Sequence, residues 1–182
     1  MMLSLYLTAL DTSEEKNRFA AFYYAHRSAM YHAAYRILGD VAGAEDTVHE
    51  AFLKMLTLPK AIPEAVDPKA RAYGVAIAEN CAIDLYRKRR RHLHLSFEEE
   101  MEIVSQPSFE TAMAEGDAVA NAIASLPPKY RSLLILRYDM GLGPQEIADL
   151  LGKSLHSIYK SIERAKARLE EALRREGIDI VG

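Results

Sequence analysis

The sequence contains a single cysteine, Cys81, so no disulfide bond can form within the 182 residues. This usage fits a reducing compartment such as the cytoplasm. No apolar run reaches the ~18 residues that a membrane-spanning helix needs, so we expect no membrane insertion. The opening MMLSLYLTAL is apolar but short, and it lacks the lysine or arginine with which a signal peptide begins. We therefore expect a cytoplasmic protein.

Residue sets typical of enzymes are also missing. His92 and His94 form the one close pair of histidines, and no cluster of metal-ligating residues surrounds them in the sequence. Cys81 lies within a predicted helix, which favours a buried packing role over that of a nucleophile. No grouping of serine, histidine and aspartate and no glycine-rich phosphate loop is visible. We therefore expect no enzyme activity, no cofactor and no metal.

Lysine and arginine are missing from the middle of the chain. Residues 92–124 carry seven acidic residues and no lysine or arginine, although the whole chain has a formal charge of only −3. Immediately before this stretch, five basic residues follow one another from Arg87 to Arg91. Residues 1–91 carry 13 basic and 11 acidic residues, and residues 125–182 carry 10 and 8. Two slightly basic segments therefore flank one acidic connector, which the net charge hides.

Helical patterns fill both basic segments, and no strand pattern, repeat or low-complexity tract is visible. In the first segment, Thr12 and Glu15 have the spacing of a capping box, and Gly39 can end the helix that they begin. Asp40 is predicted to cap a second helix that ends before residue 59. Asp67 is predicted to cap a third helix, which opens with a proline and continues into the basic run. Another helix is predicted to resume near residue 110 and to run to residue 125.

The last segment has the pattern of a helix-turn-helix. A short helix, a turn at Gly152 and a long helix capped by Ser154 follow one another, and small Ala148 permits close helix contact. Apolar residues step by three or four along the long helix and predict its buried stripe: Leu155, Ile158, Ile162, Ala165, Leu169 and Leu173. The remaining side chains are then expected to face outward, where they can donate to phosphates and base edges: His156, Ser157, Tyr159, Lys160, Ser161, Glu163 and Arg164. The other interpretation is an ordinary helical hairpin with a solvated polar face.

Three stretches carry a family resemblance. LPPKYRSLLILRYDMGLGPQEIADLLGKSLHSIYKSIERAKARLEEAL resembles region 4 of sigma-70-family sigma factors, in particular the extracytoplasmic-function group. YRILGDVAGAEDTVHEAFLKML is similar to regions 2.1 to 2.2 of that group, and ARAYGVAIAENCAIDLYRKRRR to regions 2.3 to 2.4. The resemblance implies an all-α fold with two small helical domains. We expect the region 2 bundle over residues 1–91, an acidic linker over 92–109 and the region 4 helix-turn-helix over 110–182.

The resemblance also implies a function and partners. Such proteins bind RNA polymerase core through the clamp of the largest subunit and the flap of the second-largest, recognise the −10 and −35 elements of promoter DNA, and support transcription initiation. No acidic N-terminal extension of the kind that silences primary sigma factors precedes the first helix, which implies a separate anti-sigma factor as the inhibitor. The alternative is a stand-alone helix-turn-helix transcription regulator, which would bind duplex DNA by itself.

Site residues are carried over by position. The core polymerase-binding positions are Asp46, His49, Glu50 and Phe52, with histidine where the family usually has glutamine. The −10 positions are Tyr73, Asn80, Asp84, Arg87 and Lys88, and the −35 positions are Ser157, Tyr159, Lys160, Ser161 and Arg164.

Alternatives stay open for several of these positions. The core-binding positions can also be read as a capped helix with a solvated acidic face. Tyr73 stands at the usual tryptophan position beside Gly74, which replaces a leucine, and core packing is favoured over a strand-separating role. Asp84 can instead pair with Arg87 or Lys88 within its own helix.

The acidic linker generates one prediction. We hypothesise that its carboxylates imitate nucleic acid in the positively charged channels of the polymerase; the alternative is a flexible solvated linker. Changing Glu98, Glu99, Glu100 and Glu102 to glutamine should weaken core binding or alter promoter escape. Core-binding titrations and the ratio of abortive to full-length transcripts measure these two effects. If neither quantity changes, the hypothesis is rejected.

Overall fold

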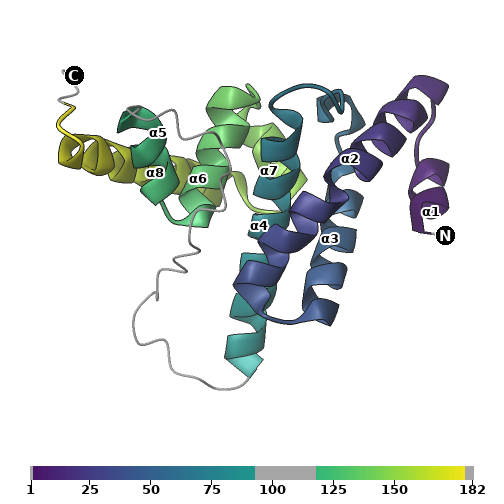
Figure 1. Cartoon of the computed structure of the whole chain (residues 1–182), viewed down its shortest axis with the longest axis horizontal. Coiled ribbons are helices and arrows are strands. Elements are labelled where there is room, and N and C mark those ends of the chain that lie inside the picture. The colour runs from purple at the N-terminus through teal and green to yellow at the C-terminus, as the bar shows by residue number, and fades with distance from the viewer. Residues whose placement is uncertain (1, 93–117, 179–182) are drawn as a thin grey trace.

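The computed structural model describes residues 2–92 and 118–178, and these residues form helices and their connections without a strand (Figure 1). The all-α prediction is confirmed. The linker prediction and the start of the helix expected from residue 110 lie outside the described residues. The helices are α1 Met2–Thr8, α2 Ser13–Leu38, α3 Val41–Met55, η1 Pro59–Ala61, α4 Ala70–His92, α5 Ala118–Ser125, α6 Pro128–Leu134, the π-helical turn η2 Ile135–Asp139, α7 Pro144–Leu151 and α8 Leu155–Arg175.

Local capping signals account for the ends of α2 and the start of α3. The backbone N–H of Glu15 donates to the Thr12 hydroxyl at 3.1 Å, and the Glu15 carboxylate accepts from the Thr12 N–H at 3.3 Å. Gly39 follows α2 with a left-handed φ of 75°, which glycine adopts without steric cost. Asp40 accepts from the N–H of Gly43 at 2.7 Å. These predicted caps are confirmed.

The start of α4 differs from the sequence prediction. The helix begins at Ala70 rather than directly after Asp67. The Asp67 carboxylate accepts from the N–H of Lys69 at 2.8 Å, and the Asp67 carbonyl from the N–H of Ala70. These bonds close a tight turn first, so the helical ladder starts three residues later.

The apolar opening of the chain forms α1, a helix that the sequence analysis did not assign. Tyr6 and Leu10 are buried, and the Tyr6 ring lies against the rings of Phe19 and Phe52. Tyr6 and Leu10, with Leu3 and Leu7 packed beside them, therefore complete the core formed by α2 and α3. Burial against this core stabilises a helix of seven residues that would be marginal alone.

Helix α4 lies between two groups of helices (Figure 1). On one side it packs against α2 and α3, which with α1 make up the N-terminal bundle. At Gly74 an added Cβ would lie 3.0 Å from both the Met30 sulfur and the Phe22 ring, so glycine allows α2 and α4 to approach closely. A leucine there, as the resemblance would suggest, has no room in this arrangement.

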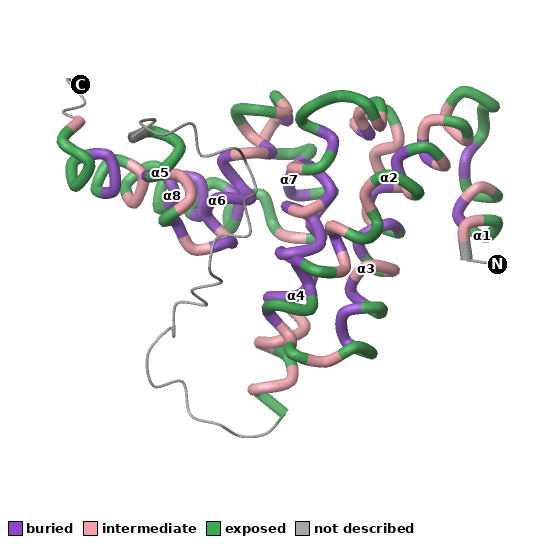
Figure 2. The backbone as a smooth tube through the Cα atoms, in the orientation of Figure 1, coloured by how far each residue is buried: buried purple, intermediate pink, exposed green. Residues whose placement is uncertain are grey.

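On its other side α4 packs against α6, η2 and α7, which belong to the C-terminal helices α5–α8. As a result, residues 76–83 are all buried (Figure 2). One continuous core joins both groups, because Leu133, Leu136, Ile147 and Leu151 cluster with the side chains of the N-terminal bundle. A second cluster lies among α5, α6 and α8 alone.

Tyr73 on α4 is fully buried and packs edge-on against Phe22, with ring centroids 6.0 Å apart. Burial raises the pKa of its phenol, which stays protonated. Its hydroxyl has no hydrogen-bond partner among the described residues. The structure thus gives Tyr73 a packing role.

The Tyr73 hydroxyl generates a stability prediction. Removing an unpaired buried hydroxyl relieves a desolvation penalty, so Tyr73→Phe should leave the free energy of unfolding unchanged or raise it by about 1 kcal/mol. Tyr6→Phe is the matched control, because the Tyr6 hydroxyl is bonded to His49, and its loss should lower stability by about 1 kcal/mol. Urea unfolding followed by circular dichroism measures both values. A clear loss in Tyr73→Phe would show that its hydroxyl has a partner.

Candidate nucleic-acid interface

The helix-turn-helix is built from α7, a turn at Gly152 and α8. Gly152 has a φ of 65°, and its neighbour Lys153 donates its N–H to the carbonyl of Ala148 at 2.9 Å. The Ser154 hydroxyl then accepts from the N–H of Ser157 at 3.2 Å and caps α8. The Glu146 carboxylate accepts from the N–H of Gly143 at 2.7 Å, which closes the start of α7 without a serine cap. The predicted turn and cap are confirmed.

The outward face of α8 carries most of the expected donors. Ser157, Tyr159, Lys160 and Arg164 are all exposed. Ser161 is an exception: it is 7% exposed, so the expectation that it faces outward was wrong. On a helix, Ser161 lies on the same face as Ile158 and Ala165, which are both buried.

The prediction that the buried stripe of α8 begins at Leu155 was also wrong. This residue is 36% exposed, whereas Ile158 and Ile162 are buried. Further along the stripe, Ile158 and Ile162 belong to the core that includes α7, and Ala165 and Leu173 cluster with α5 and α6.

The expected −10 residues on α4 are less accessible. Asn80 is buried, and its amide donates to the carbonyl of Ala76 at 2.9 Å within the same helix. Asp84 accepts from the Lys153 ammonium at 2.6 and 2.8 Å. Its partner is therefore the turn of the helix-turn-helix rather than Arg87 or Lys88. The amide nitrogen of Asn80 and both carboxylate oxygens of Asp84 therefore have hydrogen-bond partners within the chain.

The basic run at the end of α4 is partly tied to α3. The Arg89 guanidinium donates to the Asp40 carboxylate at 2.5 Å. This bond, together with the N–H of Gly43, holds the pKa of Asp40 below its usual value. Lys88 and Arg91 are exposed, and Arg87 is half-buried. Phosphates can therefore approach the end of α4 while Arg89 fixes it against the start of α3.

The expected polymerase-binding residues on α3 divide between surface and core. Asp46 and Glu50 are exposed, and Glu50 forms an ion pair with Lys54 at 3.0 Å. His49 is half-buried and is bonded to Tyr6. Phe52 is fully buried, so the expectation of a direct contact through Phe52 does not fit this arrangement. Its position on α3 turns it toward α1 and α2.

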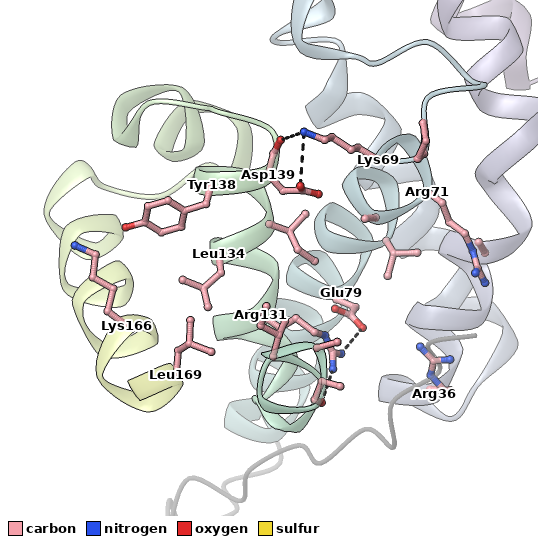
Figure 3. A pocket seen from close by; sticks show the side chains of 18 of the residues that line it. Arg36, Lys69, Arg71, Glu79, Arg131, Leu134, Tyr138, Asp139, Lys166 and Leu169 are labelled. Carbon is pink, nitrogen blue, oxygen red and sulfur yellow. Dashed lines mark hydrogen bonds and ion pairs between the residues drawn. The ribbon is translucent and has the colours of Figure 1, made fainter. Parts of the chain in front are cut away.

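A buried ion pair that the sequence analysis did not identify joins α4 to α6. The Arg131 guanidinium lies 3.2 Å from the Glu79 carboxylate, and both side chains are 3% exposed (Figure 3). The Ser132 hydroxyl donates to the other carboxylate oxygen at 3.1 Å. The available signal was a glutamate within the apolar stretch AYGVAIAENCAI, where a charge needs a partner if it is buried.

Hydrogen bonds from partly exposed lysine side chains also join the two groups of helices. Lys69 donates to the carbonyl of Asp139 at 2.8 Å (Figure 3), and Lys54 donates to the carbonyl of Leu151 at 3.3 Å. With the pair of Asp84 and Lys153, these bonds connect the C-terminal helices to α3, to the turn before α4 and to α4 itself.

A cavity of about 1290 Å³ lies between the two groups of helices. Its wall is largely apolar, including Leu134 and Leu169, and Arg36 and Lys166 stand at its edge (Figure 3). Burial lowers the pKa of Arg36, the charges of Arg131 and Arg71 lower it further, and Glu79 opposes them. The lining contains five basic and three acidic side chains, a formal charge of +2: Arg36, Lys69, Arg71, Arg131 and Lys166, with Glu79, Asp139 and Glu170.

No helix within residues 2–92 and 118–178 is long and apolar enough to cross a membrane. Over the same ranges, no three metal-ligating side chains converge on one point. Burial raises the pKa of the Cys81 thiol to about 12, and the thiol is enclosed. This environment is that of a packing residue rather than of a nucleophile.

The fold and these surfaces define an all-helical DNA-binding protein whose C-terminal helices carry a helix-turn-helix. Residues 8–92 match the family profile described as Sigma-70 region 2, and residues 116–169 match that described as Sigma-70, region 4. The chain belongs to the sigma-70 family, as an extracytoplasmic-function RNA polymerase sigma factor. Its function is that of a sigma factor in transcription initiation. Residues 8–92 and 116–169 are called region 2 and region 4 below.

Similar proteins span nearly the whole chain. The ECF RNA polymerase sigma factor SigW of Bacillus subtilis is 26% identical over 172 residues, which cover 88% of this chain and 91% of that protein. SigL of Mycobacterium tuberculosis is 28% identical over 160 residues, covering 87% and 90%. Among solved structures, the sigma factor RpoE of Bartonella quintana in complex with the anti-sigma factor NepR is 22% identical, with a TM-score of 0.40 over 81% of this chain and 91% of that one.

The Asp40 carboxylate generates a pH prediction. Its pKa is lower in the folded protein than in the unfolded chain, so it contributes stability above the unfolded value of about 3.9 and loses that contribution as the pH falls. Asp40→Asn keeps a helix cap but removes this titration. The difference in free energy of unfolding between the wild type and Asp40→Asn should therefore shrink between pH 6 and pH 3. Urea unfolding at both pH values measures it, and a constant difference would contradict the assignment.

Proposed function

We propose that this sigma factor contacts the −35 element with the outward face of α8 and the −10 element with α4 after region 4 has moved off α4. The observation that supports this most directly is the exposed outer face of α8, the helix that follows the well-formed turn at Gly152. A helix presented in this way can enter the major groove, where hydroxyls and cations meet base edges and phosphates. Four of the five expected −35 residues are available for it: Ser157, Tyr159, Lys160 and Arg164.

The proposed −10 surface is centred on Asn80 and Asp84, with Arg87 and Lys88 beside them for phosphates. An unpaired base needs a donor–acceptor side chain that is free to turn toward it. Because Asn80 is covered and Asp84 is bound to Lys153, region 4 has to leave α4 before this surface can work. Tyr73 supports the surface from beneath through its packing on Phe22.

The proposed polymerase-binding surface is the outer face of α3. Asp46 and Glu50 are exposed one turn apart, and His49 lies between them. Carboxylates at this spacing can pair with cations on the clamp of the largest subunit. We assign Phe52 to the core beneath this surface, and region 4 to the flap of the second-largest subunit.

The closed arrangement lowers the fraction of molecules that can bind. A protein whose binding-competent state is rarely populated has an apparent affinity reduced by that fraction. The buried pair of Glu79 and Arg131 favours closure, because separating these charges in an apolar interface is costly.

An anti-sigma factor is the proposed inhibitor, and the cavity between the two groups of helices suggests how it would bind. An amphipathic helix with an apolar stripe and acidic flanks would match the apolar wall and the positive edge at Arg36 and Lys166. A ligand that contacts both groups of helices at once stabilises the closed arrangement by mass action.

The first experiment tests promoter reading. Lys160→Ala and Arg164→Ala should each lower −35-dependent transcription about tenfold in a reconstituted reaction, since one good contact is worth about 1–3 kcal/mol. Arg174→Ala, on the exposed last turn of the same helix, is the matched control and should have little effect. Core binding should stay unchanged in all three variants. If the chain fails to bind polymerase core yet binds duplex DNA by itself, it acts as a stand-alone regulator and the proposal fails.

The second experiment tests closure. Glu79→Gln removes the carboxylate charge that pairs with Arg131 in the interface, and breaking a buried ion pair typically costs about 3–5 kcal/mol, so the molecule should open. The radius of gyration from small-angle scattering should rise, and −10 single strands should bind more tightly. Lys69→Ala is the control, because its ion pair is half-exposed and worth at most about 1 kcal/mol.

A compensating variant completes this test. Glu79→Leu, Arg131→Met and Ser132→Ala together replace the polar cluster with apolar groups and should restore the compact form. If Glu79→Gln remains as compact as the wild type, the ion pair does not control closure.

A further inference from the structure

A hydrogen bond between α1 and α3 lies apart from the DNA-reading helices. The Tyr6 hydroxyl is 2.5 Å from Nδ1 of His49. The Tyr6 side chain is 2% exposed, and the centroid of its ring is 5.5 Å from that of His49. Tyr6 lies before residues 8–92, which match region 2, so this contact joins a residue outside the matched range to a residue within it.

Aromatic packing fixes the Tyr6 ring in place. Its centroid lies 5.6 Å from that of Phe19, 5.7 Å from Phe52 and 6.1 Å from Tyr23. A ring enclosed on this many sides has one accessible orientation, so its hydroxyl is presented at a fixed point on α3.

The direction of this hydrogen bond follows from burial. His49 is the one hydrogen-bond partner of the Tyr6 hydroxyl among the described residues. If Nδ1 of His49 carried a proton and donated it, the hydroxyl proton of Tyr6 would be buried without an acceptor, which is costly. Burial and the charge of Tyr23 raise the pKa of Tyr6 to about 12, so the phenol keeps its proton. Tyr6 therefore donates, and the neutral imidazole carries its proton on Nε2.

We propose that Tyr6 is a positioning residue for polymerase binding, which holds His49 in the orientation and tautomer that present Nε2–H as a donor to an acceptor on the polymerase core. His49 lies between the exposed residues Asp46 and Glu50 on the outer face of α3. A neutral imidazole offers one N–H, so it can replace a glutamine amide as a donor only when its other nitrogen is occupied as an acceptor. The inference rests on the proposed function of α3 as the polymerase-binding helix.

A double-mutant cycle tests the proposal on the full chain. Tyr6→Phe keeps the packed ring but removes the donor, and it should weaken binding to polymerase core about fivefold, the size of one neutral hydrogen bond. His49→Gln supplies an amide donor that needs no fixed tautomer, so it provides a background in which Tyr6 has no imidazole to orient. Tyr6→Phe should then have no further effect in the His49→Gln background. Equal losses in both backgrounds, or no loss in Tyr6→Phe, would overturn the proposal.

Two controls separate this role from simple stabilisation. Tyr23→Phe removes a neighbouring hydroxyl in the same aromatic cluster, which bonds to Arg27 instead, and should leave core affinity unchanged. Nitrogen-15 spectra of the histidine rings should show Nε2–H for His49 in the wild type and a tautomer mixture in Tyr6→Phe; Nδ1–H in the wild type would overturn the proposal.

If α3 is not the polymerase-binding helix, the core-affinity measurements give a different result. If Asp46→Ala and Glu50→Ala leave core affinity intact, α3 is not the polymerase-binding surface, and this inference falls with that assignment. If these variants weaken binding while the cycle shows no coupling between Tyr6 and His49, only the role of Tyr6 is refuted.

Discussion

The burial of α4 on every side is the constraint on which the rest of this structure depends. Residues 76–83 span more than two helical turns and are all buried, so neighbours are required around the whole helix. Helices α2 and α3 cover one side, and α6, η2 and α7 cover the other. Glu79 within this stretch cannot reach water and is neutralised by Arg131. The contact between regions 2 and 4 is therefore part of the hydrophobic core.

This packing leaves the two helices that we propose contact DNA unequally accessible. The outer face of α8 stays open because α8 packs through its opposite stripe, which includes Ile158 and Ile162. The proposed −10 face of α4 is covered, because region 4 packs against α4 and Lys153 binds Asp84. Opening would expose apolar surface and separate the charges of Glu79 and Arg131, so it needs a partner that binds the open form more tightly than the closed one. We propose that polymerase core and promoter DNA together act as these partners.

Signals that act within one turn of backbone predicted much of the fold. The capping box of Thr12 and Glu15, the left-handed glycines Gly39 and Gly152 and the cap at Ser154 are all found where the sequence indicated them. Helix α1 has no such signal and was missed, because it is stabilised by the burial of Tyr6 and Leu10 against distant helices. Similarly, the helical spacing of the apolar residues could not show that Ser161 is buried, because this residue lies at the border of the buried stripe.

The sequence by itself determined the helical class and six of the seven outward positions predicted on α8, since these depend on local backbone preferences and on helical period. The order of regions 2 and 4 followed from the family resemblance. The tertiary structure alone decided which side chains meet. Asp84 and Lys153 are 69 residues apart, Glu79 and Arg131 are 52 apart, and Tyr6 and His49 are 43 apart. Such pairs depend on how whole helices dock, which is the sum of many weak packing contacts and leaves no local pattern in the chain.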